Sequence, residues 1–157
     1  MNHVVTWYDK PYSHVDLQFE DGMASSVFQY ENVYWKTRRF KNPNYKRLTV
    51  SVDDGAYRKA YNLCAERAKQ GYAFDAVGMY SLPIAALFSV ERDKKTFCSK
   101  HCTEVLQLAG LRTVKDATPA QMTPSALYNL VSTSAVIHAG SSPLAGLRIE
   151  VPAKPEL

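Results

Sequence analysis

Cysteine and histidine are the residue types in this chain that could carry nucleophilic chemistry. The 157-residue sequence contains three cysteines, Cys64, Cys98 and Cys102, and four histidines. A cysteine nucleophile needs a stabilised thiolate, a nearby base and donors for the oxyanion that develops on the substrate. Cys98 begins a segment of helical periodicity, and a helix N-terminus favours a thiolate and offers backbone N–H groups. His14 is the candidate base, on a strand that can approach this helix.

The same residue types also have other roles in proteins. A free cysteine is most often a small buried hydrophobic residue, and a single histidine is more often a packing or surface residue than a catalyst. Cys98, His101 and Cys102 fall within about one helical turn and could supply three metal ligands, although the sequence offers no obvious fourth. Cys64 lies in the middle of an apolar helical stripe, where a core role is expected, and Cys102 has the same interpretation.

His14 is expected near the start of a strand. In residues 13–20 apolar and polar side chains alternate at period two, and a turn-prone Asp-Gly pair follows. His14 falls on the polar face of this strand. The other expected strands are residues 4–8, 26–30, 33–39 and 47–52. Together these segments predict a meandering antiparallel sheet.

Cys98 is expected at the start of a helix. Residues 98–109 have apolar residues at helical spacing, and Gly110 is placed to end the helix. The other expected helical regions are residues 56–70 ended by Gly71, an apolar stretch from 72 towards 87, and residues 123–131. From about residue 135 an irregular tail is expected, with one strand at residues 147–151.

Length and composition are those of one globular domain, with 46% hydrophobic and 22% charged residues. No apolar run reaches the roughly 20 residues that span a bilayer, and the first residues lack the order of a signal peptide. An intracellular, cytoplasmic protein is therefore expected. The net charge of +4 is small. Residues 34–47 mix basic and aromatic side chains as single-stranded nucleic-acid surfaces do, but a solvated structural role is the favoured interpretation.

Three segments resemble the circularly permuted NlpC-type cysteine hydrolases, the YiiX-like group. The stretch FCSKHCTEVLQLAGL at residues 97–111 is similar to that group's nucleophile helix, and HVDLQFEDG at residues 14–22 is similar to its catalytic-histidine strand. GYAFDAVG at residues 71–78 is similar to a Gly-x-x-Tyr-Asp-x-x-Gly stretch, with Phe74 in the tyrosine position. The histidine precedes the cysteine, which is the permuted order and the reverse of papain.

The resemblance implies an α+β, circularly permuted papain-like fold, with an antiparallel sheet packed against helices in a single domain, residues 1–157. It implies Cys98 as the nucleophile and His14 as the general base. In the wider family a polar residue on the strand after the histidine strand orients the imidazole. Ser26 occupies that place here, and Asp16 or Gln18 on the His14 face are the alternatives.

The expected function is hydrolysis of an amide, peptide or other acyl bond through a thioester on Cys98, which requires no metal and no organic cofactor. The expected partner is a peptide, amide or acyl substrate. One alternative is a lipid acyltransferase or deacylase, as in the related lecithin retinol acyltransferase group. Another is a non-catalytic binding module of the same fold, with RNA as its candidate partner through residues 34–47. The sequence leaves the oligomeric state open.

Overall fold

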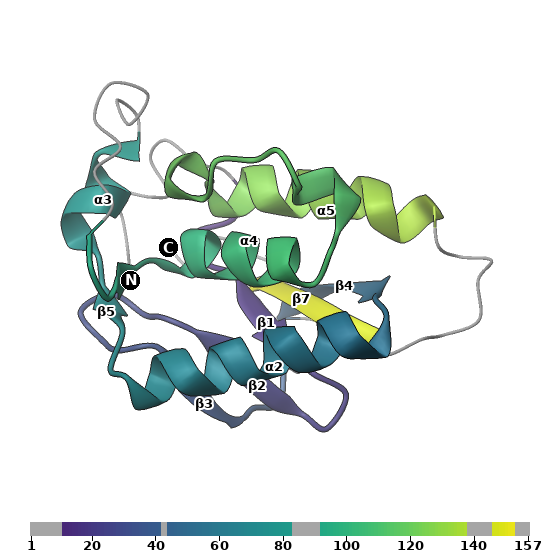
Figure 1. The fold of residues 1–157 in the computed structure, drawn as a ribbon. Helices are drawn as coiled ribbons and strands as arrows, with labels where there is room; N and C mark the ends of the chain where they lie inside the picture. Colours follow the sequence, from purple (N-terminus) through teal and green to yellow (C-terminus); the bar gives the residue numbers. More distant parts are fainter. Residues whose placement is uncertain (1–10, 42–43, 83–91, 138–145, 153–157) are drawn as a thin grey trace.

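The computed structural model describes residues 11–41, 44–82, 92–137 and 146–152. Within these ranges, five strands form one sheet in the order β3-β2-β1-β7-β4, and every neighbouring pair is antiparallel (Figure 1). The strands are β1 (Asp16–Gln18), β2 (Met23–Ser26), β3 (Tyr34–Thr37), β4 (Tyr45–Ser51) and β7 (Gly146–Pro152). The strand that follows His14 is therefore the central strand of the sheet.

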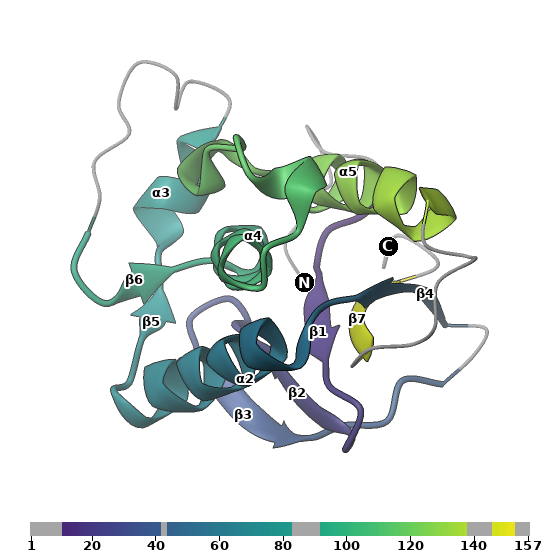
Figure 2. The same cartoon turned by 45° about the vertical axis from the view of Figure 1, so that its right-hand side comes forward.

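Three helices pack against the sheet, α2 (Asp54–Lys69), α4 (Cys98–Leu108) and α5 (Pro124–Ile137). α4 lies between the other two and contacts β1 and β2, whereas α2 contacts β3 and α5 contacts β4 and β7 (Figure 2). Because the sheet and two helices enclose α4, eight of its eleven residues are buried. The structure is thus α+β, with an antiparallel sheet packed against helices, as expected.

A smaller sheet determines where α4 begins. Its strands β5 (Ala73–Phe74) and β6 (Lys95–Thr96) pair in parallel, and α3 (Ala76–Tyr80) follows β5. β6 leads into α4 through Phe97 alone, so this pairing fixes the start of the Cys98 helix. Two short 3₁₀ helices, η2 (Arg112–Val114) and η3 (Pro119–Gln121), connect α4 to α5.

The core forms where the apolar face of β1 meets α4. Val15, Leu17 and Phe19, the alternating residues of the expected strand, are fully buried, as are Val105 and Leu106 of α4. Burial of each such side chain contributes roughly 1.5–3 kcal/mol. This packing holds the segment that carries His14 against the helix that carries Cys98.

Glycines end α2 and α4 where the sequence predicts. Gly71 follows α2 with φ +70°, and Gly110 follows α4 with φ +76°. Both lie in the left-handed region, which glycine enters without a steric penalty. At the other end of α2, the side chain of Asp53 accepts a hydrogen bond from the backbone N–H of Ala56 at 2.9 Å.

Three of the expected boundaries are wrong. The helix expected at residues 123–131 continues to Ile137 as α5. The strand expected at residues 26–30 is β2, Met23–Ser26, because the turn closes at Gly22 with φ +86° and pairing with β1 begins at once. The segment expected to be helical from residue 72 begins instead with β5, and within the described residues 72–82 its α-helix is α3, which Asp75 caps by accepting from the Gly78 N–H at 2.9 Å. The strand expected at residues 4–8 and the stretch 83–87 lie outside the described residues.

The sheet is not a simple meander. β1, β2 and β3 follow one another, but β7 lies between β1 and β4 and pairs with both. The strand expected at residues 147–151 is therefore confirmed as β7, and it lies inside the sheet rather than at its edge. The region expected to be an irregular tail from about residue 135 contains this strand and the end of α5.

Candidate active site

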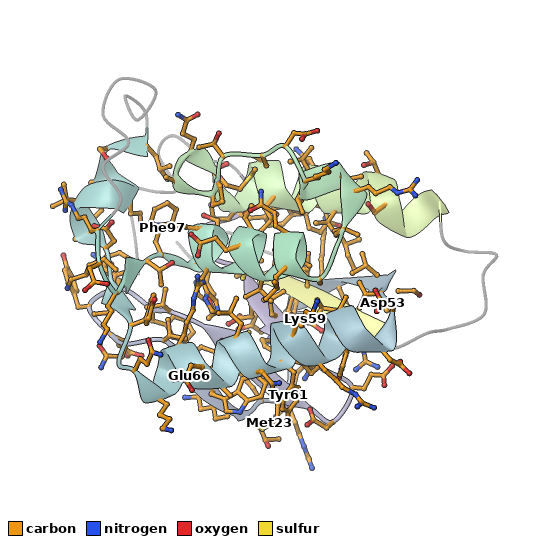
Figure 3. All side chains as sticks on the ribbon, in the orientation of Figure 1. Met23, Asp53, Lys59, Tyr61, Glu66 and Phe97 are labelled. Atoms are coloured by element: carbon orange, nitrogen blue, oxygen red, sulfur yellow. The ribbon has the colours of Figure 1, made fainter. Side chains whose placement is uncertain are left out.

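Cys98 is the first residue of α4. The residue before it, Phe97, is labelled at the start of α4 in Figure 3; it has extended backbone angles (φ −132°, ψ 166°), and its side chain makes no capping hydrogen bond. The N–H groups of the first helical turn have no carbonyl partner within the helix, so they concentrate positive potential around the Cys98 backbone. The Cys98 residue is 3% exposed. The thiol therefore lies at an open helix N-terminus in a largely desolvated position.

His14 lies two residues before β1, and its side chain is 15% exposed. The thiol group of Cys98 lies close enough to the imidazole to contribute to the raised pKa of His14. A second contact holds the same segments together, because the Cys102 thiol donates to the carbonyl of Val15 at 3.7 Å. The structure thus brings Cys98 and His14, 84 positions apart in the sequence, side by side.

The imidazole of His14 is fixed on two further sides. Its Nε2 lies 3.1 Å from Oδ1 of Asp16, and its ring stacks on Phe28 with centroids 4.4 Å apart and 15° between planes. Since Nε2 faces Asp16, Nδ1 is the ring nitrogen left for the thiol proton. The result is a Cys–His–Asp arrangement in which both partners of the imidazole are side chains with fixed positions.

Electrostatics favour the protonated imidazole. Burial lowers the pKa of His14, but the charge of Asp16 and its hydrogen bond, together with the hydrogen bond and charge of Cys98, raise that pKa to about 10. His14 is therefore an imidazolium at neutral pH. A cysteine beside an imidazolium and a helix N-terminus has the surroundings that stabilise a thiolate.

Asp16 is itself held by a buried network. It is fully buried, and its Oδ1 accepts hydrogen bonds from the Tyr34 hydroxyl and from NH1 of Arg38 at 3.0 Å. Burial and the neighbouring Asp16 charge raise the pKa of Tyr34, so the phenol stays neutral and donates. The Arg38 guanidinium lies between aromatic rings, with the centroids of Phe40 at 4.8 Å and Phe28 at 5.1 Å. These contacts keep the Asp16 carboxylate in place next to His14.

The three residues considered for orienting the imidazole have different partners. The Ser26 hydroxyl donates to the carbonyl of Val15 at 2.7 Å, and Nε2 of Gln18 donates to the carbonyl of Arg38 at 2.8 Å. Asp16 is the one of the three whose side chain contacts the imidazole of His14. Ser26 therefore connects β2 to Val15, the residue after His14. Asp16, one of the two alternatives to Ser26, lies where a side chain can orient the imidazole.

The other two cysteines have environments that keep them protonated. Burial raises the pKa of Cys64 to about 12, and burial together with the charge of Cys98 raises that of Cys102 well above its ordinary value. All three cysteines are free. Thiols with raised pKa values are poor nucleophiles at neutral pH, which leaves Cys98 as the candidate.

His101 has a structural environment. NH1 of Arg67 donates to its Nδ1 at 3.2 Å, so Nε2 carries the proton and donates to the Ser25 hydroxyl at 2.8 Å. Burial and the Arg67 charge lower the pKa of His101 to about 3, and the ring is neutral. Both ring nitrogens are therefore engaged away from a set with Cys98 and Cys102. Among the residues that the structure describes, no group of three or more His, Cys, Asp or Glu side chains could hold a metal ion.

Several site residues were missed by sequence reasoning. Phe28, Tyr34 and Arg38 were not assigned to the site, and the last two were read as part of a surface stretch. The available signal was the even spacing of Tyr34 and Arg38, four positions apart, which places them on the same side of an extended segment formed by β3 and the residue after it. That face is recognisable as the Asp16 side only once the pairing of Ser26 with Tyr34 in β3 is known.

Several side chains of the basic and aromatic stretch at residues 34–47 take part in the hydrogen-bond network around Asp16. Arg38 donates to the Tyr34 and Tyr45 hydroxyls at 3.0 and 3.2 Å, and Phe40 is buried. Side chains that are engaged in this way cannot also stack on bases. This observation weakens the interpretation of the stretch as an RNA-binding surface.

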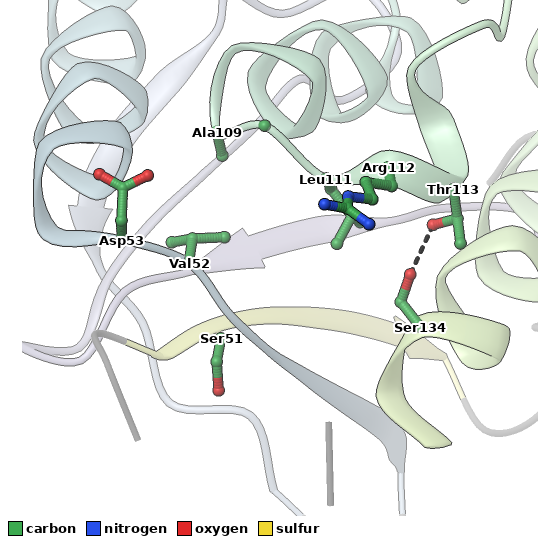
Figure 4. Close-up of a pocket in the computed structure, with 9 residues that line it drawn as sticks. Ser51, Val52, Asp53, Ala109, Leu111, Arg112, Thr113 and Ser134 are labelled. Carbon is green, nitrogen blue, oxygen red and sulfur yellow. Dashed lines mark hydrogen bonds between the residues drawn. The ribbon is translucent and has the colours of Figure 1, made fainter. Parts of the chain in front are cut away.

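A separate cavity of about 450 Å³ lies at the opposite end of α4, beside Ala109 (Figure 4). Its lining includes Asp53, Arg112 and the Thr113–Ser134 pair, whose hydroxyl oxygens are 2.6 Å apart. An eleven-residue helix is about 16 Å long. This cavity is therefore distinct from the Cys98 site.

Comparison of the chain with protein-family models, with curated proteins and with solved structures gave no match. Within the described ranges, none of the helices has both the length and the apolar character needed to cross a bilayer. The geometry around Cys98 is therefore the basis for assigning a function to this protein.

Proposed function

We propose that this protein is a cysteine hydrolase with a permuted papain-like arrangement, which cleaves an amide or peptide bond through a thioester on Cys98. One observation carries the proposal. The thiol at the N-terminus of α4 lies near the imidazole of His14, whose Nε2 faces the buried carboxylate of Asp16. This is the relation of nucleophile, base and orienting group that acyl-transfer chemistry needs.

The first half of the reaction begins from an ion pair. His14, whose pKa is raised to about 10, enters as the imidazolium, and in this proposal Cys98 enters as the thiolate. The Cys98 thiolate attacks the substrate carbonyl carbon and forms a C–S bond, and the carbonyl electrons move to oxygen. As that oxyanion collapses, His14 donates its proton to the leaving nitrogen, the C–N bond breaks and the amine departs. The product of this half is the Cys98 thioester and a neutral His14.

The second half restores the site. Neutral His14 takes a proton from water as the water oxygen attacks the thioester carbon. The C–S bond then breaks, the carboxylic acid leaves, and the thiolate–imidazolium pair is regenerated. The backbone N–H of Cys98 is the proposed donor to both oxyanions, supported by the uncapped first turn of α4. Asp16 holds the imidazole with Nδ1 towards the sulfur throughout both halves.

Amide or peptide bonds are the first choice of substrate because His14 can protonate an amine leaving group, which amide cleavage requires. Thioesters and lipid acyl groups share the same chemistry, and they are the next substrate classes to test. A non-catalytic binding module of the same fold is the alternative from a different class. That alternative predicts no unusual reactivity at Cys98.

The test is the rate of iodoacetamide labelling at each cysteine, measured by mass spectrometry from pH 5 to 9. We expect Cys98 to be labelled at pH 6 at least tenfold faster than Cys64 or Cys102, which serve as controls within the same molecule. His14→Ala should reduce the Cys98 rate at least tenfold, because the thiolate loses its counter-charge. Equal rates at all three cysteines would refute the proposal.

A second measurement addresses catalysis itself. The native protein is incubated with peptide, thioester and acyl-lipid libraries, quenched in acid and examined for a mass adduct on Cys98. A peptidyl or acyl adduct, absent from Cys98→Ala, is the expected result, and its mass identifies the acyl group. If Cys98 is reactive but no library member is hydrolysed, the thiol is reactive without catalytic turnover, and this result would contradict the hydrolase function.

A further inference from the structure

A cavity of about 330 Å³ lies between the C-terminal part of α2, β6 and the first turns of α4. Its lining is strongly basic, with five cationic side chains against two acidic ones. The lining residues are Arg67, Tyr72, Arg92, Asp93, Lys94, Lys95, Lys100 and Glu104. Neither Cys98 nor His14 belongs to this lining, so the cavity is separate from the candidate active site.

Lys100 is the informative residue of this cavity. Its side chain is only 9% exposed, and the ion pair that the structure gives it, with Oε1 of Glu104, spans 3.9 Å. That separation is too long for a hydrogen bond. A cation whose nearest counter-charge lies beyond hydrogen-bond distance can bind an anion that enters the adjoining space. Lys100 is such a cation, with its stem largely buried and its side chain on the wall of the cavity.

Glu104 cannot supply the missing charge, because it is already paired. Its Oε2 lies 2.6 Å from NH2 of Arg67, whose side chain is 13% exposed. NH1 of Arg67 also donates to His101, yet its Nε is buried and has no hydrogen-bond partner in the part of the chain that the structure describes. Two nearly buried cations therefore share a single carboxylate.

The nearby cations add to the imbalance. Lys94 and Lys95 are exposed at the rim, and Arg92 has Asp75 as its ion-pair partner, at 3.4 Å. Cationic groups that converge on one concave space raise the local concentration of anions and favour a ligand with more than one negative charge. A phosphate group carries up to two charges and three acceptor oxygens, which suits both ammonium and guanidinium donors.

We propose that this cavity binds a small phosphate-bearing ligand, with its phosphate group on Lys100 and the surrounding cations. The volume falls in the range of small-molecule sites. The proposal does not depend on chemistry at Cys98. The shared chemistry is the phosphate group, whether it belongs to free inorganic phosphate or to an organic phosphate monoester.

The experiment is isothermal titration calorimetry of the full chain with inorganic phosphate and with glycerol phosphate, at constant ionic strength set by chloride. Saturable binding of either ligand is expected. Lys100→Met, which keeps the aliphatic stem and removes the charge, should weaken binding at least tenfold. Lys59→Met is the matched control, because Lys59 is an exposed residue of α2 outside the cavity (Figure 3), and it should bind like the native protein.

A second variant covers the case in which Lys100→Met does not fold. Lys95→Gln changes an exposed side chain of the lining and should weaken phosphate binding severalfold without affecting the circular dichroism spectrum. Stronger binding of glycerol phosphate than of phosphate assigns an organic monoester, and the reverse assigns the free ion. The proposal is overturned if neither ligand gives saturable heat, or if the Lys100 and Lys95 variants both bind like the native protein.

Discussion

Replacement of Asp16 by asparagine removes the charge that holds the His14 proton while it preserves the size of the side chain. Oδ1 of Asp16 lies 3.1 Å from Nε2 of His14, and its charge is the largest influence that raises the pKa of the imidazole. Burial acts in the opposite direction. In Asp16→Asn the imidazole therefore keeps the burial penalty and loses most of the compensation, and we expect its pKa to fall to 6.5 or below.

The magnitude follows from the shift. A pKa of about 10 against the ordinary 6.5 corresponds to about 5 kcal/mol in favour of the imidazolium in the folded protein. The pKa is raised on folding, so this stabilisation is complete below pH 6.5 and is lost as the pH rises through 10. The native protein should lose stability across that window, and Asp16→Asn should lack this part of the slope.

The assay is a pH titration of the imidazole resonances by NMR, with urea unfolding at pH 6, 8 and 9.5. In the native protein the His14 resonances should move near pH 10, and in Asp16→Asn near or below pH 6.5. Asp54→Asn is the matched control, because Asp54 is an exposed residue in the first turn of α2. A native His14 that titrates near 6.5, or an Asp16→Asn variant whose His14 titrates like the native one, would refute the reasoning.

Two further predictions concern neighbouring groups. Ser26→Ala should lower the free energy of unfolding by roughly 1 kcal/mol, because the Val15 carbonyl loses the shorter of its two buried donors and keeps the Cys102 thiol, and should leave the Cys98 labelling rate within about twofold; a tenfold fall in labelling would instead make Ser26 the orienting residue. The pKa of His101 is lowered on folding to about 3. The folded protein therefore binds a proton at His101 less readily than the unfolded chain does, and its free energy of unfolding should fall by roughly 3 kcal/mol between pH 6.5 and 4. Urea unfolding of native and His101→Gln protein at both pH values checks this, since the variant should lack that loss.

Local sequence patterns determined much of the secondary structure. Alternation in residues 13–20 indicated the buried face of β1, and helical spacing indicated α2 and α4, whose ends agree with Gly71 and Gly110. These features depend on contacts within a few residues, so the chain itself records them. The position of Cys98 at the start of α4 belongs to the same class, because it follows from where periodicity begins.

Short-range reasoning failed where two signals competed. At Tyr72 to Phe74 the apolar composition suited a helix, but pairing with β6, about twenty residues later, makes this segment a strand. The position of β7 between β1 and β4 had no local signal for the same reason, since strand order depends on long-range hydrogen bonds.

The candidate site shows the same division. The sequence by itself determined the chemical types, a cysteine at a helix start and a histidine beside a strand, and it put Asp16 on the His14 face. Only the tertiary structure decided that Asp16, rather than Ser26, contacts the imidazole, and that Tyr34 in β3 and Arg38 just after β3 hold Asp16. The physical reason is that an orienting contact depends on distances of about 3 Å between side chains, and those distances exist only after the strands have paired and α4 has packed on them.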